Sequence, residues 1–356
     1  MRTAVFALTA AGAALGGRVV LALGDEAELF VSQRHPVSGA RYFEKLQQAV
    51  AENFPRYDAL VFIMAAGIAV RTIAPYLKSK LEDPAVLVLD ERAQHVISLL
   101  SGHVGGANDL ARRLALSLGA DPVITTATDV EGYLAPDAIA SKLGLFPEPH
   151  EEIQRLNSAL LEGKKIFYYI DPVCRLADFY ARELWGHGFR LADFAALPDE
   201  AQALQVVISE NEEIPLRQGR LFLRPLRLIA GVGCRRGTKS SYIKKALTEA
   251  AAKLGLPLQA VAAMASTVFK DEEQGLFDTA RELGVPLSFY DNDALNRMIY
   301  RYDLRESAFV RRITGVGNVC ESAALAAAGS GRLVLGKTKF EKVTVALVWQ
   351  KKQKSQ

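Results

Sequence analysis

The feature that most constrains the fold of this chain is a regular alternation of short apolar segments with longer amphipathic ones. The segments ALVFIM at 59–64 and AVLVL at 85–89 are apolar at every position, which is typical of strands that are buried on both faces of a sheet. Segments with helical spacing lie around them, at 10–23 and 107–118 for example. Alternating strands and helices predict a doubly wound, mostly parallel α/β domain over residues 1–128.

The other elements that the pattern predicts in this domain are strands at 2–8, 27–31, 95–100 and 122–125 and helices at 41–52 and 68–81. The first 24 residues superficially resemble a signal peptide, but they fit a strand and a helix better because Arg18 would interrupt the apolar core of a signal. No apolar run reaches the length of a membrane span, so we expect no membrane partner.

The remaining chain divides into two further parts. Residues 129–225 are less regular, with helical patterns at 138–143, 151–162 and 177–185 and strand patterns at 164–170 and 205–209. They predict a small α+β middle region. From Leu226 the sequence restarts as a strand, a glycine-rich loop and an amphipathic helix. It predicts a second α/β domain at 226–350, followed by a short tail at 351–356.

Charge is unevenly distributed over these parts. Residues 226–356 hold 21 Lys and Arg against 12 Asp and Glu, whereas residues 1–225 hold 22 against 28. A basic C-terminal domain predicts an anionic partner. Nucleic acid is disfavoured, because the basic residues are spread over loops without an aromatic stripe or a known nucleic-acid-binding motif. The three cysteines are far apart and form no C-x-x-C pair, which disfavours disulfides and a zinc site and indicates a cytoplasmic protein.

Four loops have the position at which α/β sheets collect ligands, between a strand and the next helix. The first is AAGIAVRTIAP at 65–75. Gly67 would allow close approach, and Arg71 would bind a carboxylate through two hydrogen bonds. The alternative is an ordinary surface arginine.

The second loop is SGHVGGAND at 101–109, where His103 is a candidate general acid or base because imidazole titrates near neutral pH. The alternative is that His103 only holds the loop beside Asn108. The pattern is not G-x-G-x-x-G, so a dinucleotide site is poorly supported. The candidate binding residues of this loop are Ser101, Gly102, Gly105, Gly106 and Asn108.

The third loop is GVGCRRGTKSS at 231–241. It is not a Walker A loop, because Thr238 stands where that motif requires lysine. It fits a general anion nest. Cys234 is predicted as a small buried residue, although neighbouring arginines would lower its pKa. The candidate binding residues are Gly233, Arg235, Arg236 and Thr238.

The fourth loop is TGVGNVCESAA at 314–324, with Gly315, Gly317 and Glu321 as candidate binding residues. Between the third and fourth loops lies ASTVFKDEEQGL at 265–276. Its Lys270 and Glu273 are three residues apart. On a helix they would form an ordinary ion pair; in a cleft they would be a cation and an acid–base carboxylate.

Taken together and in this order, "GIAVR", "LLSGHVGGANDLA", "GVGCRRGT", "STVFKDEEQGL" and "GVGNVCESAAL" resemble the CbiG family of cobalamin biosynthesis, the cobalt-precorrin-5A hydrolases. The resemblance covers nearly the whole chain, although the middle region carries little signal. It implies that the lactone of cobalt-precorrin-5A is opened with water, that acetaldehyde leaves, and that cobalt-precorrin-5B is formed. It implies no cofactor, because the cobalt belongs to the substrate.

This anionic cobalt-tetrapyrrole is a flat, apolar macrocycle with a rim of carboxylates, which needs an apolar slot and fixed cations. The candidate rim contacts are then Arg71, Arg235, Arg236, Lys239, Lys270 and Lys337. Without a G-x-S-x-G elbow, direct attack by water is expected, with His103 as general base, Glu273 as second acid–base group and Arg71 or Lys270 at the oxyanion.

Two alternatives to this hydrolase remain from the sequence. One is a non-catalytic cobalt-tetrapyrrole-binding protein with the same slot. The other is a phosphate-ligand enzyme, such as a sugar-phosphate isomerase, whose glycine-rich loops would bind phosphate. The absence of a Walker A or Rossmann fingerprint counts against the second.

Overall fold

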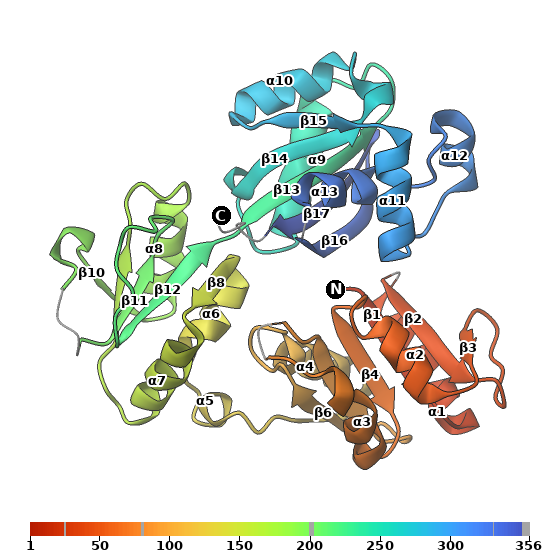
Figure 1. The fold of residues 1–356 in the computed structure, drawn as a ribbon, viewed down its shortest axis with the longest axis horizontal. Helices are drawn as coiled ribbons and strands as arrows, with labels where there is room; N and C mark the ends of the chain where they lie inside the picture. The colour runs from red at the N-terminus through yellow and green to blue at the C-terminus, as the bar shows by residue number, and fades with distance from the viewer. Residues whose placement is uncertain (25, 80–81, 199–202, 330, 351–356) are drawn as a thin grey trace. The chain divides into compact units, whose positions relative to one another are not determined.

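The computed structural model describes residues 1–24, 26–79, 82–198, 203–329 and 331–350, so the predicted tail lies outside the described residues. The chain forms two compact units. The first unit comprises Met1–Ser141 with Leu160–Gly163, and the second comprises Lys142–Ala159 with Lys164–Gln356. The first contains one seven-stranded sheet and the second two five-stranded sheets (Figure 1). The predicted α/β class is confirmed. No described helix is long and apolar enough to cross a membrane.

The sheet of the first unit has the strand order β3-β2-β1-β4-β5-β6-β7, in which β6 is antiparallel to β5 and the other pairings are parallel. Its strands are β1 (Thr3–Ala7), β2 (Ala27–Ser32), β3 (Arg41–Phe43), β4 (Ala59–Ile63), β5 (Ala85–Leu89), β6 (His95–Leu100) and β7 (Asp121–Val123). Its helices are α1 (Ala10–Leu23), α2 (Leu46–Asn53), α3 (Ala66–Ile73), the 3-10 turn η1 (Ala74–Tyr76), α4 (Ala107–Leu118) and α5 (Ala127–Val130), and α6 (Pro136–Leu143) ends at the boundary of the unit.

Both faces of this sheet are covered, as continuous apolar strands require. Alternate residues of β1 point to opposite faces: Val5 packs with α1 and α4, whereas Phe6 packs with α2 and α3. Phe6 stacks on Phe30 and Phe62, with ring centroids 5.0 and 5.4 Å apart. The doubly wound arrangement that the sequence predicts is therefore present.

The direction of β6 changes the placement of the SGHVGGAND loop. Because β5 and β6 form an antiparallel hairpin, the loop after β6 lies at the edge of the sheet where β4 and β5 begin. The loop after β4, which carries Arg71, lies at the opposite edge. Both loops follow the carboxyl end of a strand and precede a helix, as predicted. They nevertheless lie at opposite edges of the sheet, which was not predicted, since the residue pattern of a strand does not specify its direction.

Two predicted helices are shorter than expected. The segment 41–52 begins as β3, because Arg41–Phe43 pairs with Phe30–Ser32 and buries Phe43, and α2 starts only at Leu46. The segment 68–81 is helical only as far as Ile73, where η1 with Pro75 follows. Pro75 has no backbone N–H and cannot donate the hydrogen bond that would continue the α-helix, so the helix passes into the 3-10 turn there.

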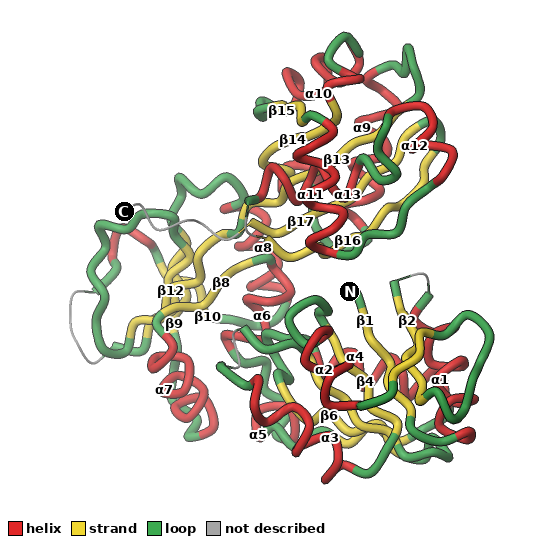
Figure 2. Tube along the Cα trace, turned by 45° about the vertical axis from the view of Figure 1, so that its right-hand side comes forward, coloured by secondary structure: helices red, strands yellow, loops and turns green. Residues whose placement is uncertain are grey.

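The middle sheet lies in the second unit and has the order β10-β9-β11-β12-β8, with β8 antiparallel to β12 and the rest parallel. Only Leu226 separates β12 from β13, so the middle sheet leads directly into the C-terminal one (Figure 2). Its elements are β8 (Leu145–Glu148), α7 (His150–Leu161), β9 (Phe167–Ile170), α8 (Ala177–Gly186), β10 (Arg190–Ala192), the 3-10 turn η2 (Phe194–Ala196), β11 (Gln205–Ile208) and β12 (Arg220–Pro225).

The C-terminal sheet has the order β15-β14-β13-β17-β16, in which β17 is antiparallel to both of its neighbours. Its strands are β13 (Arg227–Cys234), β14 (Val261–Thr267), β15 (Leu287–Tyr290), β16 (Gly331–Phe340) and β17 (Val343–Gln350). Helices α11 and α13 cover one face, and α9 packs against β17 and α10. The helices are α9 (Ser240–Ala252), α10 (Gln274–Leu283), α11 (Asn292–Tyr302), α12 (Ala308–Thr314) and α13 (Cys320–Ala328), with 3-10 turns η3 (Leu258–Ala260) and η4 (Val268–Lys270).

Candidate functional site

The loop that follows β6 folds tightly on itself. Ser101 has a positive φ of 56° and donates a hydrogen bond from its hydroxyl to the carbonyl of Asp83. A side chain at Gly105 would approach the Cβ of Ser101 to 2.4 Å, and Gly106 has a φ of 84° at the start of α4. The two glycines are thus required by the turn itself. Their predicted contact with a ligand stays a prediction.

His103 lies between two carboxylates. Its Nε2 is 2.8 Å from Oδ2 of Asp129 on α5, and its Nδ1 is 3.3 Å from Oδ2 of Asp137 on α6. The three side chains are largely buried, with exposures of 11%, 16% and 2%. Burial alone would lower the pKa of His103, but the hydrogen bonds and charges of Asp137 and Asp129 outweigh it and raise the pKa above its usual value.

The partners of His103 are themselves held. Asp129 accepts hydrogen bonds from Arg112 Nη2 at 2.6 Å and from Asn108 Nδ2 at 2.9 Å. Burial would raise the pKa of Asp129, but Arg112 and His103 lower it overall. The carbonyl oxygen of the Asn108 side chain accepts from Ser98, and a Cβ at Gly102 would approach that oxygen to 2.7 Å. We call His103, Asn108, Arg112, Asp129 and Asp137 the His103 network.

The His103 network binds two short helices to one loop. Both ring nitrogens face carboxylates, so the protonated imidazolium can donate to each. A general base needs an unprotonated nitrogen directed at the substrate. The geometry therefore favours the alternative interpretation, in which His103 holds the loop. The groups that His103 binds are carboxylates of α5 and α6 rather than groups of α4. The general-base role stays a prediction.

Arg71 lies on the exposed surface of α3, where its Nη1 donates to the carbonyl of Gly67 at 2.8 Å. Because β5 has five residues at about 3.3 Å each, the two edges of this sheet are roughly 13 Å apart along the strands. The structure therefore does not bring Arg71 together with His103.

The C-terminal sheet brings two of the predicted segments together at one edge. Strands β13, β14 and β15 are parallel and end there, and β17 begins opposite Cys234. The loop after β13 and the start of α10 are in close contact, since a Cβ at Gly275 would lie 2.0 Å from the carbonyl oxygen of Thr238. The predicted loops 231–241 and 265–276 thus form one surface.

Lys270 and Glu273 form an ion pair on this surface. Lys270 Nζ lies 2.9 Å from Glu273 Oε1, and the backbone N–H of Gly237 donates to Oε2 at 2.8 Å. Burial would raise the pKa of Glu273, but the hydrogen bonds from Lys270 and Gly237 and the charge of Arg236 lower it overall. The carboxyl group is therefore ionised at neutral pH. Lys270 ends η4 and Glu273 precedes α10, so the pair lies on a turn and not on a helix.

Next to this pair, apolar side chains are exposed that the sequence analysis did not single out. Phe269 is 56% exposed, Val268 is 38% exposed and Phe277 is 40% exposed. Phe269 and Val268 directly precede Lys270 on η4. In the sequence, the only sign of this exposed surface is the apolar pair Val268-Phe269 between a predicted strand and Lys270. Such a pair cannot be distinguished from the last residues of a buried strand.

Cys234 ends β13 as a half-buried residue. Burial raises the pKa of its thiol to about 11. The positive charge of Lys270 lowers this pKa, but less strongly than burial raises it. The suggested lowering of the pKa by neighbouring arginines was wrong. A protonated thiol is a poor nucleophile, so Cys234 has no feature of a catalytic cysteine.

The other predicted residues of this domain have contacts within the fold. Glu321 Oε1 accepts from the backbone N–H of Lys337 at 2.8 Å, beside an irregularity in the pairing of β16 with β17. The fourth loop, at 314–324, lies between α12 and α13 and not after a strand, so its predicted position was wrong. The N–H of Gly317 donates to Glu306 at 3.1 Å, and Gly315 ends α12 with a φ of 77°. A Cβ at Gly233 would lie 2.7 Å from Thr344 Oγ1, and the Thr238 hydroxyl donates to the Arg235 carbonyl. These contacts give each residue a structural role within the domain. The predicted contacts of these residues with a substrate stay predictions.

No group of three or more His, Cys, Asp or Glu side chains that could hold a metal ion occurs among the described residues.

Known proteins resemble this chain over almost all of its length. Residues 48–129 match the family described as cobalamin synthesis G N-terminal, residues 134–225 the cobalamin biosynthesis central region, and residues 228–348 the cobalamin synthesis G C-terminus. A cobalt-precorrin-5A hydrolase of Salmonella typhimurium is 36% identical over 332 residues, which cover 90% of each chain. One of Priestia megaterium is 32% identical over 309 residues, which cover 83% of this chain and 79% of the other.

The fold has a match among solved structures. A crystal structure of a cobalamin biosynthesis protein G homologue from Sulfolobus solfataricus has a TM-score of 0.60 and 23% identity, and the match covers 98% of this chain and 97% of that one. The family models match parts of all three sheets, and relatives above 30% identity extend over most of the chain. The chain therefore belongs to the CbiG family of cobalamin biosynthesis.

Proposed function

We propose that this protein is a cobalt-precorrin-5A hydrolase, which opens the lactone of cobalt-precorrin-5A with water and releases acetaldehyde to give cobalt-precorrin-5B. The observation that carries the proposal is the 36% identity to a hydrolase of that name over nine-tenths of both chains. Membership of the family in all three regions supports it.

The edge of the C-terminal sheet suits the substrate chemically. A macrocycle with an apolar face and a carboxylate rim needs apolar surface next to fixed positive charge. Phe269 and Val268 supply exposed apolar surface, and Lys270 lies next to them. Arg235 and Arg236 follow β13 at the same edge and would bind rim carboxylates. Lys337 is a further rim contact in this proposal.

The reaction needs a base for water and positive charge for the developing oxyanion. In the proposal, ionised Glu273 accepts a proton from the attacking water, and the Lys270 ammonium stabilises the tetrahedral oxyanion. The ester C–O bond then breaks to leave a carboxylate and an alkoxide. The alkoxide becomes the aldehyde as the adjacent C–C bond breaks, and the ring carbon keeps the electron pair of that bond.

The remaining predicted residues enter the proposal in weaker roles. Arg71 and Gly67 lie together on α3, where Arg71 would bind a carboxylate of the substrate. His103 would act as a general base only if one of its two carboxylates moved away from its ring nitrogen. If the His103→Ala variant releases acetaldehyde at the normal rate under single-turnover conditions, that role is excluded.

The proposal includes no cofactor, since the cobalt arrives with the substrate. It places the enzyme in the cytoplasm, which the three free cysteines support.

The test is anaerobic incubation of the protein with cobalt-precorrin-5A, followed by measurement of acetaldehyde and of the product mass. The proposal expects stoichiometric acetaldehyde and a product of the mass of cobalt-precorrin-5B. Binding of the macrocycle without acetaldehyde would instead support the non-catalytic binding protein.

A further inference from the structure

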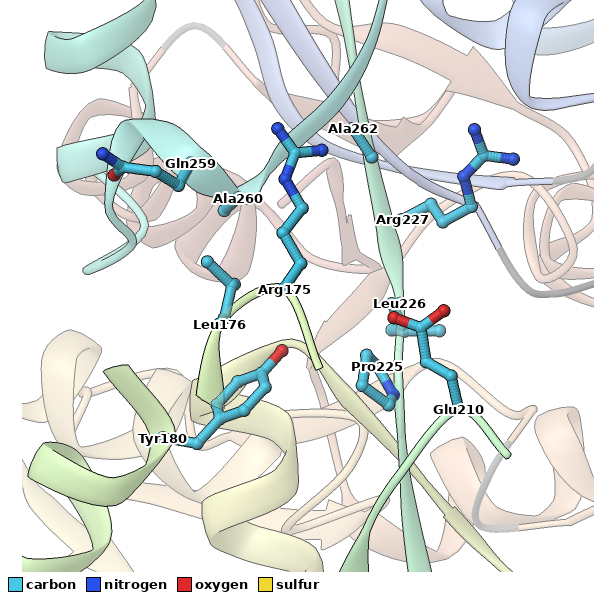
Figure 3. Close-up of a pocket in the computed structure, with 10 residues that line it drawn as sticks. All are labelled: Arg175, Leu176, Tyr180, Glu210, Pro225, Leu226, Arg227, Gln259, Ala260 and Ala262. Atoms are coloured by element: carbon cyan, nitrogen blue, oxygen red, sulfur yellow. The ribbon is translucent and has the colours of Figure 1, made fainter. Parts of the chain in front are cut away.

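A small cavity lies in the second unit, where the middle sheet meets the start of the C-terminal sheet. It has a volume of about 50 Å³ and is lined by residues that follow β9 and β11, by α8 and by the first residues of β13 and β14 (Figure 3). Such a volume exceeds the roughly 10–15 Å³ that one water molecule requires. It has room for the head group of a small ligand.

Two guanidinium groups lie at one end of this cavity. Those of Arg175 and Arg227 are found on either side of Ala262 (Figure 3), and neither forms an ion pair among the described residues. Burial and the positive charge of Arg227 lower the pKa of Arg175, and together they outweigh the attraction of Glu210. With two arginines and one glutamate, the lining carries a net charge of +1, which matches a single negative charge.

The rest of the lining combines two polar side chains, Tyr180 and Gln259, with an apolar surface. Tyr180 is only 2% exposed, yet its hydroxyl points among the lining residues and takes part in no hydrogen bond among the described residues (Figure 3). Burial raises its pKa, so it remains a hydrogen-bond donor. The apolar lining consists of Leu176, Pro225, Leu226, Ala260 and Ala262.

The cavity is separate from the proposed reaction site. Arg227 begins β13, whereas the loop with Arg235 and Arg236 follows its last residue, Cys234. Eight residues at about 3.3 Å each place these two ends roughly 23 Å apart. A ligand in the cavity is therefore not part of the chemistry at Glu273.

We propose that this cavity binds a carboxylate on an apolar carbon chain, with the two arginines on the carboxylate, Tyr180 as an added donor and the apolar lining around the chain. The net charge favours a monocarboxylate over phosphate, which carries more charge and has no apolar part. The carboxylate belongs either to a free small acid or to a side arm of a tetrapyrrole.

The test follows the side-chain Nε–Hε NMR signals of arginine-labelled, full-length protein during titration with butyrate. We expect saturable shifts of the Arg175 and Arg227 signals, and none with neutral butyramide. Arg175→Gln or Arg227→Gln should weaken binding about tenfold or more, and Glu210→Gln should strengthen it. The control is Arg182→Gln on α8, outside the lining, which should leave the affinity unchanged.

Two further titrations define the ligand. A tetrapyrrole with propionate arms that shifts the same signals at lower concentration than butyrate would identify a side arm; a response to butyrate alone would identify a free acid. The proposal would be overturned if the signals of Arg175 and Arg227 shifted linearly with butyrate concentration and the Arg182 signal shifted equally. Such shifts would report only the change in ionic strength. Tighter saturation by inorganic phosphate would also overturn it.

Discussion

The His103 network of the first unit and the Lys270–Glu273 ion pair of the second unit both hold ionised carboxylates next to cations, but they differ in what surrounds them. In the His103 network, each side chain is bonded to another part of the same network. The ion pair has exposed Phe269 and Val268 beside it and lies at the edge where the basic loops of the C-terminal sheet meet.

The difference separates two uses of charge in a protein. A buried network in which every group is bonded fixes one arrangement of the chain, and opening it is costly. The Lys270–Glu273 pair is also largely buried, with side-chain exposures of 17% and 10%, but exposed apolar surface lies beside it, so a ligand that binds this surface would reach the pair. We therefore expect the His103 network to control stability and the ion pair to control turnover.

The largest effect is expected from Glu273→Gln, which removes the proposed base. Acetaldehyde release under single-turnover conditions should fall by about 10²–10⁴-fold. The free energy of unfolding should fall by about 1–2 kcal/mol, because the carboxylate is only 10% exposed and accepts hydrogen bonds from Lys270 and Gly237. The control is Glu272→Gln at the neighbouring exposed position, which should turn over normally. Normal turnover by Glu273→Gln would remove Glu273 from the mechanism.

Asp137→Asn should have the largest effect on stability. Its side chain is 2% exposed and faces His103, so the variant leaves a buried imidazolium with one partner fewer. The free energy of unfolding should fall by about 3 kcal/mol, as measured by urea denaturation. Asp109→Asn, at a side chain that is 65% exposed, should cost about 0.5 kcal/mol or less. Equal losses in the two variants would contradict the distinction between network and surface.

Phe269→Ala should weaken substrate binding with little effect on stability, because more than half of the side chain is already exposed. Loss of one aromatic contact with the macrocycle corresponds to about 1 kcal/mol, or an approximately fivefold rise in KM with kcat nearly unchanged. Tyr300→Ala, at an exposed aromatic on α11, is the comparison. A similar rise in KM in both variants would show that Phe269 has no specific role.

The smallest effect is the pH dependence of stability that His103 causes. Its pKa in the folded state is raised by Asp137 and Asp129. The stabilisation is therefore complete below the unfolded pKa of about 6.5 and is lost as the pH rises through the folded value. Unfolding measured from pH 6 upward should show stability falling in the wild type and a smaller fall in His103→Gln; parallel curves would contradict the assignment.

The sequence predicted the broad architecture because strand and helix periodicity is local. The doubly wound sheet of the first unit and the restart at Leu226 both follow from it. Strand direction is not local. The residue pattern of β6 does not show that it runs antiparallel to β5, so the loop with His103 was assigned to the wrong edge. Helix α11 was not predicted, because only two of its residues, Leu295 and Ile299, are buried.

The candidate site could be predicted in part. Lys270 and Glu273 were found because their charges stand next to a strand end, and the structure places them 2.9 Å apart. The partners of His103 were not predicted, since Asp129 and Asp137 are 26 and 34 residues away in the chain. The exposure of Phe269 depends on how the turn after β14 is oriented, which sequence spacing does not specify.

The central claim, that turnover depends on the C-terminal ion pair and stability on the His103 network, is tested most directly by comparing Glu273→Gln with His103→Gln in one experiment. Both variants are given cobalt-precorrin-5A anaerobically in a single-turnover assay for acetaldehyde at a temperature where both are folded. We predict that His103→Gln releases acetaldehyde at close to the normal rate and that Glu273→Gln is at least about 10²-fold slower. A normal rate for Glu273→Gln together with a comparable loss in His103→Gln would contradict the account.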